Sequence, residues 1–342
     1  MITKMTMASV DYADGPGPNT QKVAVLVSAY CLEIRYAAIP EPGEGEVRVK
    51  IKYVGICGSD LEAYRGTRAP EFITTPARLG HEVAGVIDRI GSGVIGLKPG
   101  DVVSCRYVWG AFAEYIICKP FQVKVMPPSI PLKEASLTEI LPSVMHAVSL
   151  AAISPEKNVL IMGQGVSGLI LTQAAALHSP RNLVVTDLFD RNLKLAKKYG
   201  ASHAFRLPSR DSRSMDTLGA DFPQGFDVVI PCLLEGNGIV DAIDCCATGA
   251  KLVLYGCIGI CNKPVDFFKV HRRRIDILST EPKRDVDNRR FYDEGVRLVA
   301  EGLINTSEIV DAVIPLSEID RGFQMRNAET EEFIHVLIDC EA

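Results

Sequence analysis

The sequence predicts a two-domain α/β protein, with a β-rich first domain and a second domain built on a doubly wound parallel sheet. Three observations support this prediction. The 342 residues are too many for one ordinary hydrophobic core. Short apolar runs separated by glycine and proline dominate up to about residue 150. From residue 154 onward, strand and helix patterns alternate around a glycine-rich loop, which is typical of a nucleotide-binding sheet.

The first part of the chain is expected to form strands joined by irregular loops. Residues 1–20 lack usable periodicity and are predicted to be a flexible tail. Residues 46–54 alternate apolar and charged side chains, which is the period-two pattern of a half-buried strand. Further strands are predicted at 23–27, 31–39, 83–90 and 101–103.

The second part follows a strand–loop–helix order. An apolar strand at 158–162 leads into Gly-Gln-Gly-Val-Ser-Gly at 163–168, and an apolar helix is predicted at 169–177. The next strand, at 182–186, ends at Asp187, 19 residues after the last glycine of the loop. Later strands are expected at 226–230, 251–255 and 275–279, with a helix at 239–245. We therefore expect a nucleotide-binding domain at 154–284 and a first domain at 21–153, completed by residues 285–342.

The glycine-rich loop predicts a dinucleotide site because of its position between a strand and a helix. Gly163 permits a tight turn, Gly165 lets backbone approach a pyrophosphate, and Gly168 lets the helix pack on the sheet. The backbone of Val166 and Ser167 opens the helix, whose N-terminus attracts an anion. Asp187 can accept hydrogen bonds from ribose hydroxyls and would repel a 2′-phosphate, so the sequence favours NAD over NADP.

Composition excludes several other classes. A formal net charge of -5 gives no reason to expect nucleic acid or an anionic membrane as a partner. No apolar run is long enough to span a membrane, and the first residues lack the apolar core of a signal peptide. The ten cysteines are scattered and show no disulfide framework, so we expect reduced thiols in a cytoplasmic protein.

A second cluster of motifs suggests metal chemistry. Gly-Ile-Cys-Gly-Ser-Asp at 55–60 and Gly-His-Glu at 80–82 bring together a thiol, an imidazole, carboxylates and a hydroxyl. Sulfur, nitrogen and carboxylate ligands suit zinc, and the hydroxyl can move a proton beside it. We interpret this stretch as half of a catalytic zinc site.

These motifs together resemble the zinc-dependent medium-chain dehydrogenase/reductase superfamily. The resemblance also includes Lys-Pro-Gly-Asp-Val-Val at 98–103 and Gly-Ala-Phe-Ala-Glu-Tyr at 110–115, and it covers residues 22–340 in order. It implies a GroES-like catalytic domain followed by a Rossmann domain. It also implies hydride transfer between NAD and an alcohol whose pKa zinc lowers.

The resemblance assigns ligands residue by residue. Cys57 and His81 match two catalytic zinc ligands, and Glu139 matches the third within the segment 138–147, although the proline of that segment has moved. Glu82 matches a glutamate that in relatives swings onto the metal or is replaced by water. Asp60 matches a carboxylate that hydrogen-bonds the ligand imidazole and fixes its tautomer.

The resemblance also implies a proton path and a substrate class. Ser59 matches the hydroxyl that passes the proton from the substrate oxygen, and Glu62 stands where many relatives have a histidine that completes the relay. A glutamate as third ligand resembles the polyol, sugar and threonine dehydrogenase branch, so we expect a secondary alcohol or ketone on a hydroxylated or amino-bearing small molecule. Arg65, Arg68 and Arg78 either serve an anionic substrate or are solvated loop charges.

One departure from the family concerns the metal count. Relatives commonly carry a lobe with four closely spaced cysteines, whereas this region has only Cys105 and Cys118. Two cysteines are too few for a closed tetrahedral site, so we predict one catalytic zinc and no structural zinc. By family analogy we expect a homodimer or homotetramer.

Two other interpretations remain open. One is a zinc-free enone or quinone reductase of the same superfamily, although such members lack the set Cys57, His81 and Glu139. The other is a catalytically silent nucleotide-binding protein, which the retention of Ser59 beside the ligands argues against.

Overall fold

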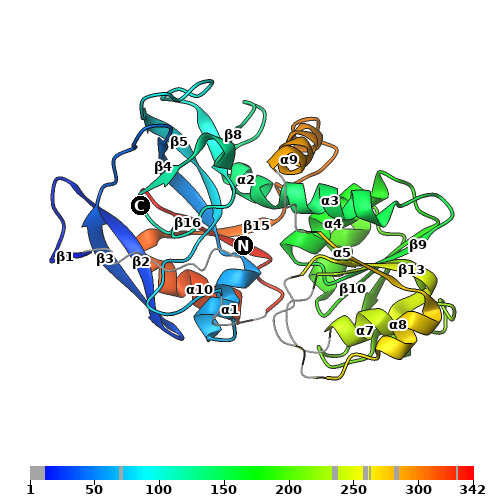
Figure 1. The fold of residues 1–342 in the computed structure, drawn as a ribbon. Coiled ribbons are helices and arrows are strands. Elements are labelled where there is room, and N and C mark those ends of the chain that lie inside the picture. Colours follow the sequence, from blue (N-terminus) through cyan, green and yellow to red (C-terminus); the bar gives the residue numbers. More distant parts are fainter. Residues whose placement is uncertain are drawn as a thin grey trace. The chain divides into compact units, whose positions relative to one another are not determined.

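The computed structural model describes residues 12–68, 72–232, 238–256, 261, 263–280, 285–328 and 330–342. The chain forms two compact units. The first comprises Met1–Glu139 with Thr306–Ala342, and the second comprises Ile140–Asn305. The C-terminal segment therefore returns to the first unit, where β16 (His335–Asp339) pairs antiparallel with β4 (Val47–Gly55) and lies beside it in Figure 1.

The first unit is built from antiparallel strands with few helices. Its main sheet, counted over the described residues, has seven strands in the order β15-β16-β4-β5-β6-β8, with β7 paired to β4. A smaller sheet has the order β1-β3-β2. The remaining strands are β1 (Tyr12–Ala13), β2 (Thr20–Ser28), β3 (Cys31–Ala38), β5 (Glu82–Ile90), β6 (Val102–Cys105), β7 (Tyr115–Cys118), β8 (Val123–Val125) and β15 (Val310–Pro315).

The helices of the first unit are short. They are α1 (Gly58–Arg65), α2 (Leu132–Ala135) and α10 (Ile319–Asn327), with 3₁₀ turns at Pro120–Gln122, Ser136–Ile140 and Leu316–Glu318. Helices α1 and α10 lie next to each other (Figure 1), joined by hydrogen bonds from Tyr64 to Asp320 and from Arg65 to Asn327. Glycine at position 322 lets α10 approach closely, because a Cβ there would lie 2.9 Å from Ile338 and 3.2 Å from Ile56.

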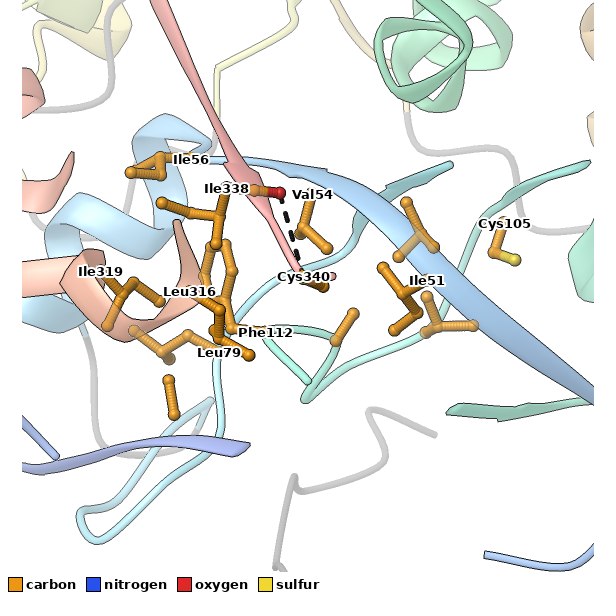
Figure 2. Close-up of a cluster of buried hydrophobic side chains, with 14 of the residues drawn as sticks. Ile51, Val54, Ile56, Leu79, Cys105, Phe112, Leu316, Ile319, Ile338 and Cys340 are labelled. Carbon is orange, nitrogen blue, oxygen red and sulfur yellow. Dashed lines mark hydrogen bonds between the residues drawn. The ribbon is translucent and has the colours of Figure 1, made fainter. Parts of the chain in front are cut away.

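Apolar residues from distant segments form the core of the first unit (Figure 2). Phe112, Leu79 and Ile56 are fully buried within it, together with Ile338 from the last strand. Ile56 directly precedes Cys57, and Leu79 precedes Gly80 and His81. The loops that carry two predicted ligands are therefore anchored by side chains buried in one core.

The second unit contains a parallel sheet. Over the described residues its six strands have the order β11-β10-β9-β12-β13-β14, so the sheet is extended in both directions from β9. Its strands are β9 (Asn158–Met162), β10 (Asn182–Asp187), β11 (His203–Arg206), β12 (Phe226–Pro231), β13 (Cys246–Leu254) and β14 (Asp276–Ser279). Its helices are α3 (Leu141–Ala151), α4 (Val166–Ala176), α5 (Asp190–Lys198), α6 (Ser214–Leu218), α7 (Gly238–Cys245), α8 (Phe267–Arg273) and α9 (Asp285–Ala300).

The structure differs from the sequence-based expectations at three places. Part of the predicted tail is ordered, since Tyr12–Ala13 pairs with β3; residues 1–11 of that tail lie outside the described residues. Arg48, expected on the exposed face of β4, is buried because Asp88, Glu41 and the carbonyl of Pro40 accept its hydrogen bonds. The division between units also differs from the predicted limits, because α3 packs against α9 and α4 in the second unit.

Among the described residues, none of the helices combines the length and apolar character that crossing a membrane requires.

Candidate functional site

Three side chains converge at one end of β5 in the first unit. Cys57, His81 and Glu82 each offer a ligand atom, and these atoms all lie within 4.8 Å of one another. Within the described part of the chain, this is the one place where three or more histidine, cysteine or acidic side chains converge so closely. A thiol, an imidazole and a carboxylate form the donor set of a zinc site with an open position.

Asp60 fixes the two loops that carry Cys57 and His81. Its side chain is 1% exposed, and one carboxylate oxygen accepts from the backbone N–H of Cys57 at 3.1 Å. The other oxygen accepts from the N–H of Gly80 at 3.1 Å and lies 3.6 Å from Nδ1 of His81. The predicted contact with the imidazole is therefore at ion-pair distance, while the hydrogen bonds of Asp60 hold the backbone on both sides of the site.

We expect Asp60→Asn to loosen this arrangement. The amide keeps one acceptor oxygen, so the buried N–H of Cys57 or Gly80 loses its partner, at a cost of about 1–3 kcal/mol. Denaturant unfolding measures that loss, and metal analysis after dialysis should show weaker metal retention. Asp101→Asn is the matched control, because Asp101 accepts one exposed backbone N–H, from Lys98. Equal losses of stability in the two variants would contradict the role given to Asp60.

A histidine of the last strand, β16, contacts the carboxylate of Glu82. Nε2 of His335 lies 3.1 Å from Oε2 of Glu82, and His335 is 0% exposed. Both side chains need the glycine at position 55, since a Cβ there would lie 2.0 Å from Oε2 of Glu82 and 2.5 Å from Nε2 of His335. The pairing of β16 with β4 thus brings a residue from near the C-terminus against a candidate ligand.

The electrostatics of the group favour a bound cation. Burial, followed by the charge of Glu82, raises the pKa of the Cys57 thiol, so a thiolate there needs a positive partner. Burial alone would raise the pKa of Glu82, but His335 and His81 outweigh it and lower the value. Oε2 of Glu82 is buried, and although Nε2 of His335 lies 3.1 Å away, this contact does not meet hydrogen-bond geometry within the described residues. The residues present therefore fit a zinc ion, which would neutralise the thiolate and the carboxylate together.

Glu139, predicted as the third ligand, is paired with an arginine in this structure. Its carboxylate is buried and pairs with Arg106 at 3.0 Å. It is not part of the group formed by Cys57, His81 and Glu82. A buried guanidinium beside Glu139 satisfies the charge that a metal would otherwise compensate.

The two predicted proton-relay residues occupy successive turns of α1. Ser59 and Glu62 are three residues apart, a spacing that places side chains on one helix face. Arg68 joins them, since its guanidinium lies 3.4 Å from the carbonyl oxygen of Ser59 and 3.4 Å from Oε2 of Glu62. Glu62 is buried, so its charge is compensated chiefly inside the protein.

The glycine-rich loop of the second unit has the local geometry that the sequence predicts. Gly163 has φ +90°, a conformation that side chains rarely adopt. A Cβ at Gly168 would lie 1.9 Å from the carbonyl oxygen of Gly163, so the helix packs directly on the turn. A Cβ at Gly165 would meet nothing within 4 Å, which leaves space for a ligand to approach the backbone. Val166 begins α4, and the N–H groups of Val166 and Ser167 lie in its first turn.

Asp187 stands at the end of β10 and holds this loop. One of its carboxylate oxygens accepts from the N–H of Gln164 at 2.6 Å, and the other accepts from the N–H of Phe189 at 2.9 Å. Burial raises the pKa of Asp187, although these hydrogen bonds oppose the shift. The acid therefore shapes the loop, and its carboxylate still has acceptor capacity for ribose hydroxyls.

Two cysteines that the sequence singled out form a pair within the core. The sulfur atoms of Cys105 and Cys118 lie 3.8 Å apart on strands β6 and β7, and both are buried. Among the described residues no further histidine, cysteine or acid joins them to make a group of three. We therefore still predict one metal site per chain.

Sequence reasoning missed three residues at the site. His335 is a polar residue inside an apolar strand, which was a usable signal, but its partner lies more than 250 residues earlier. The ring of Trp109 packs against that of His81, tilted by 44° with centroids 4.4 Å apart, and only the fold of the loop after β6 brings it there. Arg326 also carries its charge near Glu82 and Cys57, and burial lowers its pKa.

Comparisons with known proteins agree with this architecture. The family model for the alcohol dehydrogenase GroES-like domain matches residues 43–128, and the model for zinc-binding dehydrogenases matches residues 167–284. Sorbitol dehydrogenase of Bacillus subtilis is 28% identical over 91% of this chain and 96% of that protein. L-Idonate 5-dehydrogenase of Vitis vinifera is 30% identical over 72% of this chain and 77% of that protein.

A solved structure has the same fold over nearly the whole chain. Galactitol-1-phosphate dehydrogenase from Escherichia coli superposes with a TM-score of 0.77 at 24% identity, covering 93% of this chain and 99% of that one. The predicted pairing of a GroES-like domain with a Rossmann domain is confirmed. On these similarities the chain belongs to the zinc-dependent medium-chain dehydrogenase/reductase superfamily.

Proposed function

We propose that this protein is a zinc-dependent oxidoreductase that transfers a hydride between NAD(H) and a secondary alcohol or ketone. The observation that carries the proposal is the convergence of Cys57, His81 and Glu82 in one unit of a chain whose other unit has a glycine-rich loop between a strand and a helix. Relatives named for sorbitol, L-idonate and L-threonine support a polyol, sugar or amino-polyol as the substrate.

The metal proposal assigns the ligands as follows. Cys57 and His81 would hold the ion, and Glu82, whose carboxylate lies beside them, would supply a further ligand. We keep Glu139 as a predicted further ligand. To bind the ion, its carboxylate would have to leave its present partner, Arg106. The chemistry that zinc supplies is Lewis acidity, which lowers the pKa of an alcohol. One zinc per chain is proposed, without a structural zinc.

The residues of α1 give the proton a route away from the substrate oxygen. In this proposal Ser59 accepts the proton from the alcohol and passes it toward Glu62, which occupies the next turn on the same face. The guanidinium of Arg68 lies 3.4 Å from the Glu62 carboxylate. Nicotinamide accepts the hydride when the cofactor is bound. The homodimer or homotetramer and the cytoplasmic location stay predictions from the sequence.

Metal analysis and a substrate panel test the function. The purified chain should contain about one zinc per chain and should reduce NAD with alditols, amino-polyols or simple secondary alcohols. Removal of zinc by a chelator should abolish the activity, and added zinc should restore it. A protein that lacks zinc and reduces enones would instead be a zinc-free reductase. A protein that binds NADH but turns over none of these substrates would be catalytically silent.

Cofactor preference should depend on Asp187. We expect Asp187→Asn to lower the ratio of kcat/KM for NAD to that for NADP by about tenfold or more, because the carboxylate that repels a 2′-phosphate is lost. The amide oxygen still accepts a hydrogen bond from the loop, which limits the structural change. Asp190→Asn is the control, since Asp190 is half-exposed at the start of α5 and pairs with Arg206. An unchanged ratio in Asp187→Asn would remove Asp187 from cofactor selection.

A further inference from the structure

A cavity of about 430 Å³ opens on the first unit, and none of its lining residues belongs to the metal group. Its apolar wall consists of Tyr53 and Val86, on adjacent strands, together with Pro131 and Leu132 at the start of α2. Its other lining residues are charged, namely three lysines and one glutamate. Cavities of about 300–1,000 Å³ with apolar walls and a few polar groups are typical small-molecule sites. The charged groups therefore indicate what kind of molecule fits.

A carboxylate of the protein already occupies the charged side of this cavity. Oε1 of Glu341 lies 2.9 Å from Nζ of Lys50, and Oε2 lies 3.1 Å from Nζ of Lys52. Each oxygen is therefore held by a different ammonium group. Hydrogen bonds from both lysines lower the pKa of Glu341, so its carboxylate is ionised at neutral pH. The two lysines thus form a carboxylate-binding pair, and a side chain of the protein is its present occupant.

The cavity carries more positive than negative charge. Lys133 also lines it, and among the described residues no carboxylate pairs with Lys133. Lys52 pairs with Asp339 at 2.9 Å as well as with Glu341, so three ammonium groups face two carboxylates. The side chain of Glu341 is 37% exposed, and exposed ion pairs are weak, so a ligand can take its place. Once Glu341 leaves, three ammonium groups face one carboxylate, which leaves two positive charges for a ligand.

We propose that this cavity binds a small dicarboxylate. The first carboxylate replaces that of Glu341 on Lys50 and Lys52, the second pairs with Lys133, and the carbon spacer lies against the apolar wall. Two negative charges match the two positive charges that remain, whereas a neutral polyol would leave both without a counter-charge. The apolar wall favours charges separated by a spacer over a compact anion such as phosphate, because removing CH₂ groups from water is favourable.

Calorimetric titration of the full chain at low ionic strength tests the site. Glutarate and butyrate differ by one carboxylate, so the Kd of glutarate should be lower by about fivefold, the upper range for an exposed ion pair. Lys133→Met should raise the Kd of glutarate by about fivefold and keep that of butyrate within about twofold, because only the second carboxylate uses Lys133. Lys50→Met should weaken both anions by about fivefold.

Glu341→Gln provides a test with the opposite sign. It should lower the Kd of both anions by about fivefold or more, because the tethered carboxylate no longer competes for the two lysines. A gain in affinity cannot come from loss of folding, and thermal unfolding checks that the lysine variants are folded. Lys98→Met is the control for the lysine changes, since Lys98 is exposed on the same unit and does not line the cavity. Its Kd for glutarate should stay within about twofold.

Four results would overturn the dicarboxylate site. Glutarate might give no saturable heat with either the unchanged protein or Glu341→Gln, or butyrate might bind as tightly as glutarate. Equally tight binding of inorganic phosphate would show that the apolar wall plays no part, and equal weakening by Lys98→Met would show attraction by net charge alone. The titration contains neither NAD nor an alcohol, so its result is independent of the proposed oxidoreductase activity.

Discussion

Replacement of Cys57 by serine should abolish metal binding and lower kcat/KM by at least about a thousandfold. The expected loss is large because Lewis-acid stabilisation contributes several kcal/mol, and each 1.4 kcal/mol corresponds to about tenfold in rate. A serine hydroxyl is a poor zinc ligand, since it does not ionise as a thiol does. The helix should survive, because Cys57 is the N-cap of α1 and serine is among the preferred N-cap residues.

Three measurements make this prediction specific. Elemental analysis should find almost no zinc in Cys57→Ser, NAD reduction should fall as stated, and thermal unfolding should lose only the contribution of the bound ion. Cys31→Ser is the control, because Cys31 is an exposed free thiol on β3 of the same unit. If Cys57→Ser retains one zinc and normal activity, the metal group described above is not the catalytic site.

Two alanine substitutions in the glycine loop should both weaken NADH binding, but only one of them should lower stability. In Gly168→Ala the new Cβ would lie 1.9 Å from a backbone oxygen of Gly163, so the helix and the turn must separate. We expect a loss of about 1–3 kcal/mol in the free energy of unfolding, together with weaker NADH binding. Gly165 has φ −71° and no neighbour within 4 Å, so alanine fits there without strain.

Gly165→Ala should therefore leave thermal unfolding unchanged and still weaken NADH binding by about tenfold or more, because the methyl group occupies the approach of the pyrophosphate. Titration of NADH fluorescence measures binding, and denaturant unfolding measures stability. The two variants serve as each other's control. Normal NADH affinity in Gly165→Ala would show that the loop does not carry the cofactor phosphates.

Local sequence patterns predicted much of the fold because the apolar periodicity of a strand and the glycines of a turn act over a few neighbouring residues. The strand predicted from the alternation in residues 46–54 corresponds to β4. The predicted strand, glycine loop and helix correspond to β9, the turn after it and α4. Gly163 and Gly168 behave as their spacing indicated, since the turn conformation and the close helix contact depend on residues within six positions.

Positions that depend on distant segments were not predictable in this way. Arg48 occupies a polar position of β4, yet it is buried because Asp88 on the neighbouring strand accepts its hydrogen bonds. Glu139 has the motif of a ligand, but the fold places Arg106 against it. Tyr12–Ala13 becomes a strand only because β3 offers it an edge.

The sequence by itself determined the two-part architecture, and its short motifs singled out the glycine-rich loop and the side chains of Cys57, His81 and Glu82 as candidates for cofactor and metal binding. The tertiary structure decided how these ligands are held and what surrounds them. Asp60 ties together the two loops that carry Cys57 and His81, His335 contacts Glu82 from the last strand, and Trp109 packs against His81. These contacts arise from strand pairing and core packing across large sequence separations, which no local pattern records.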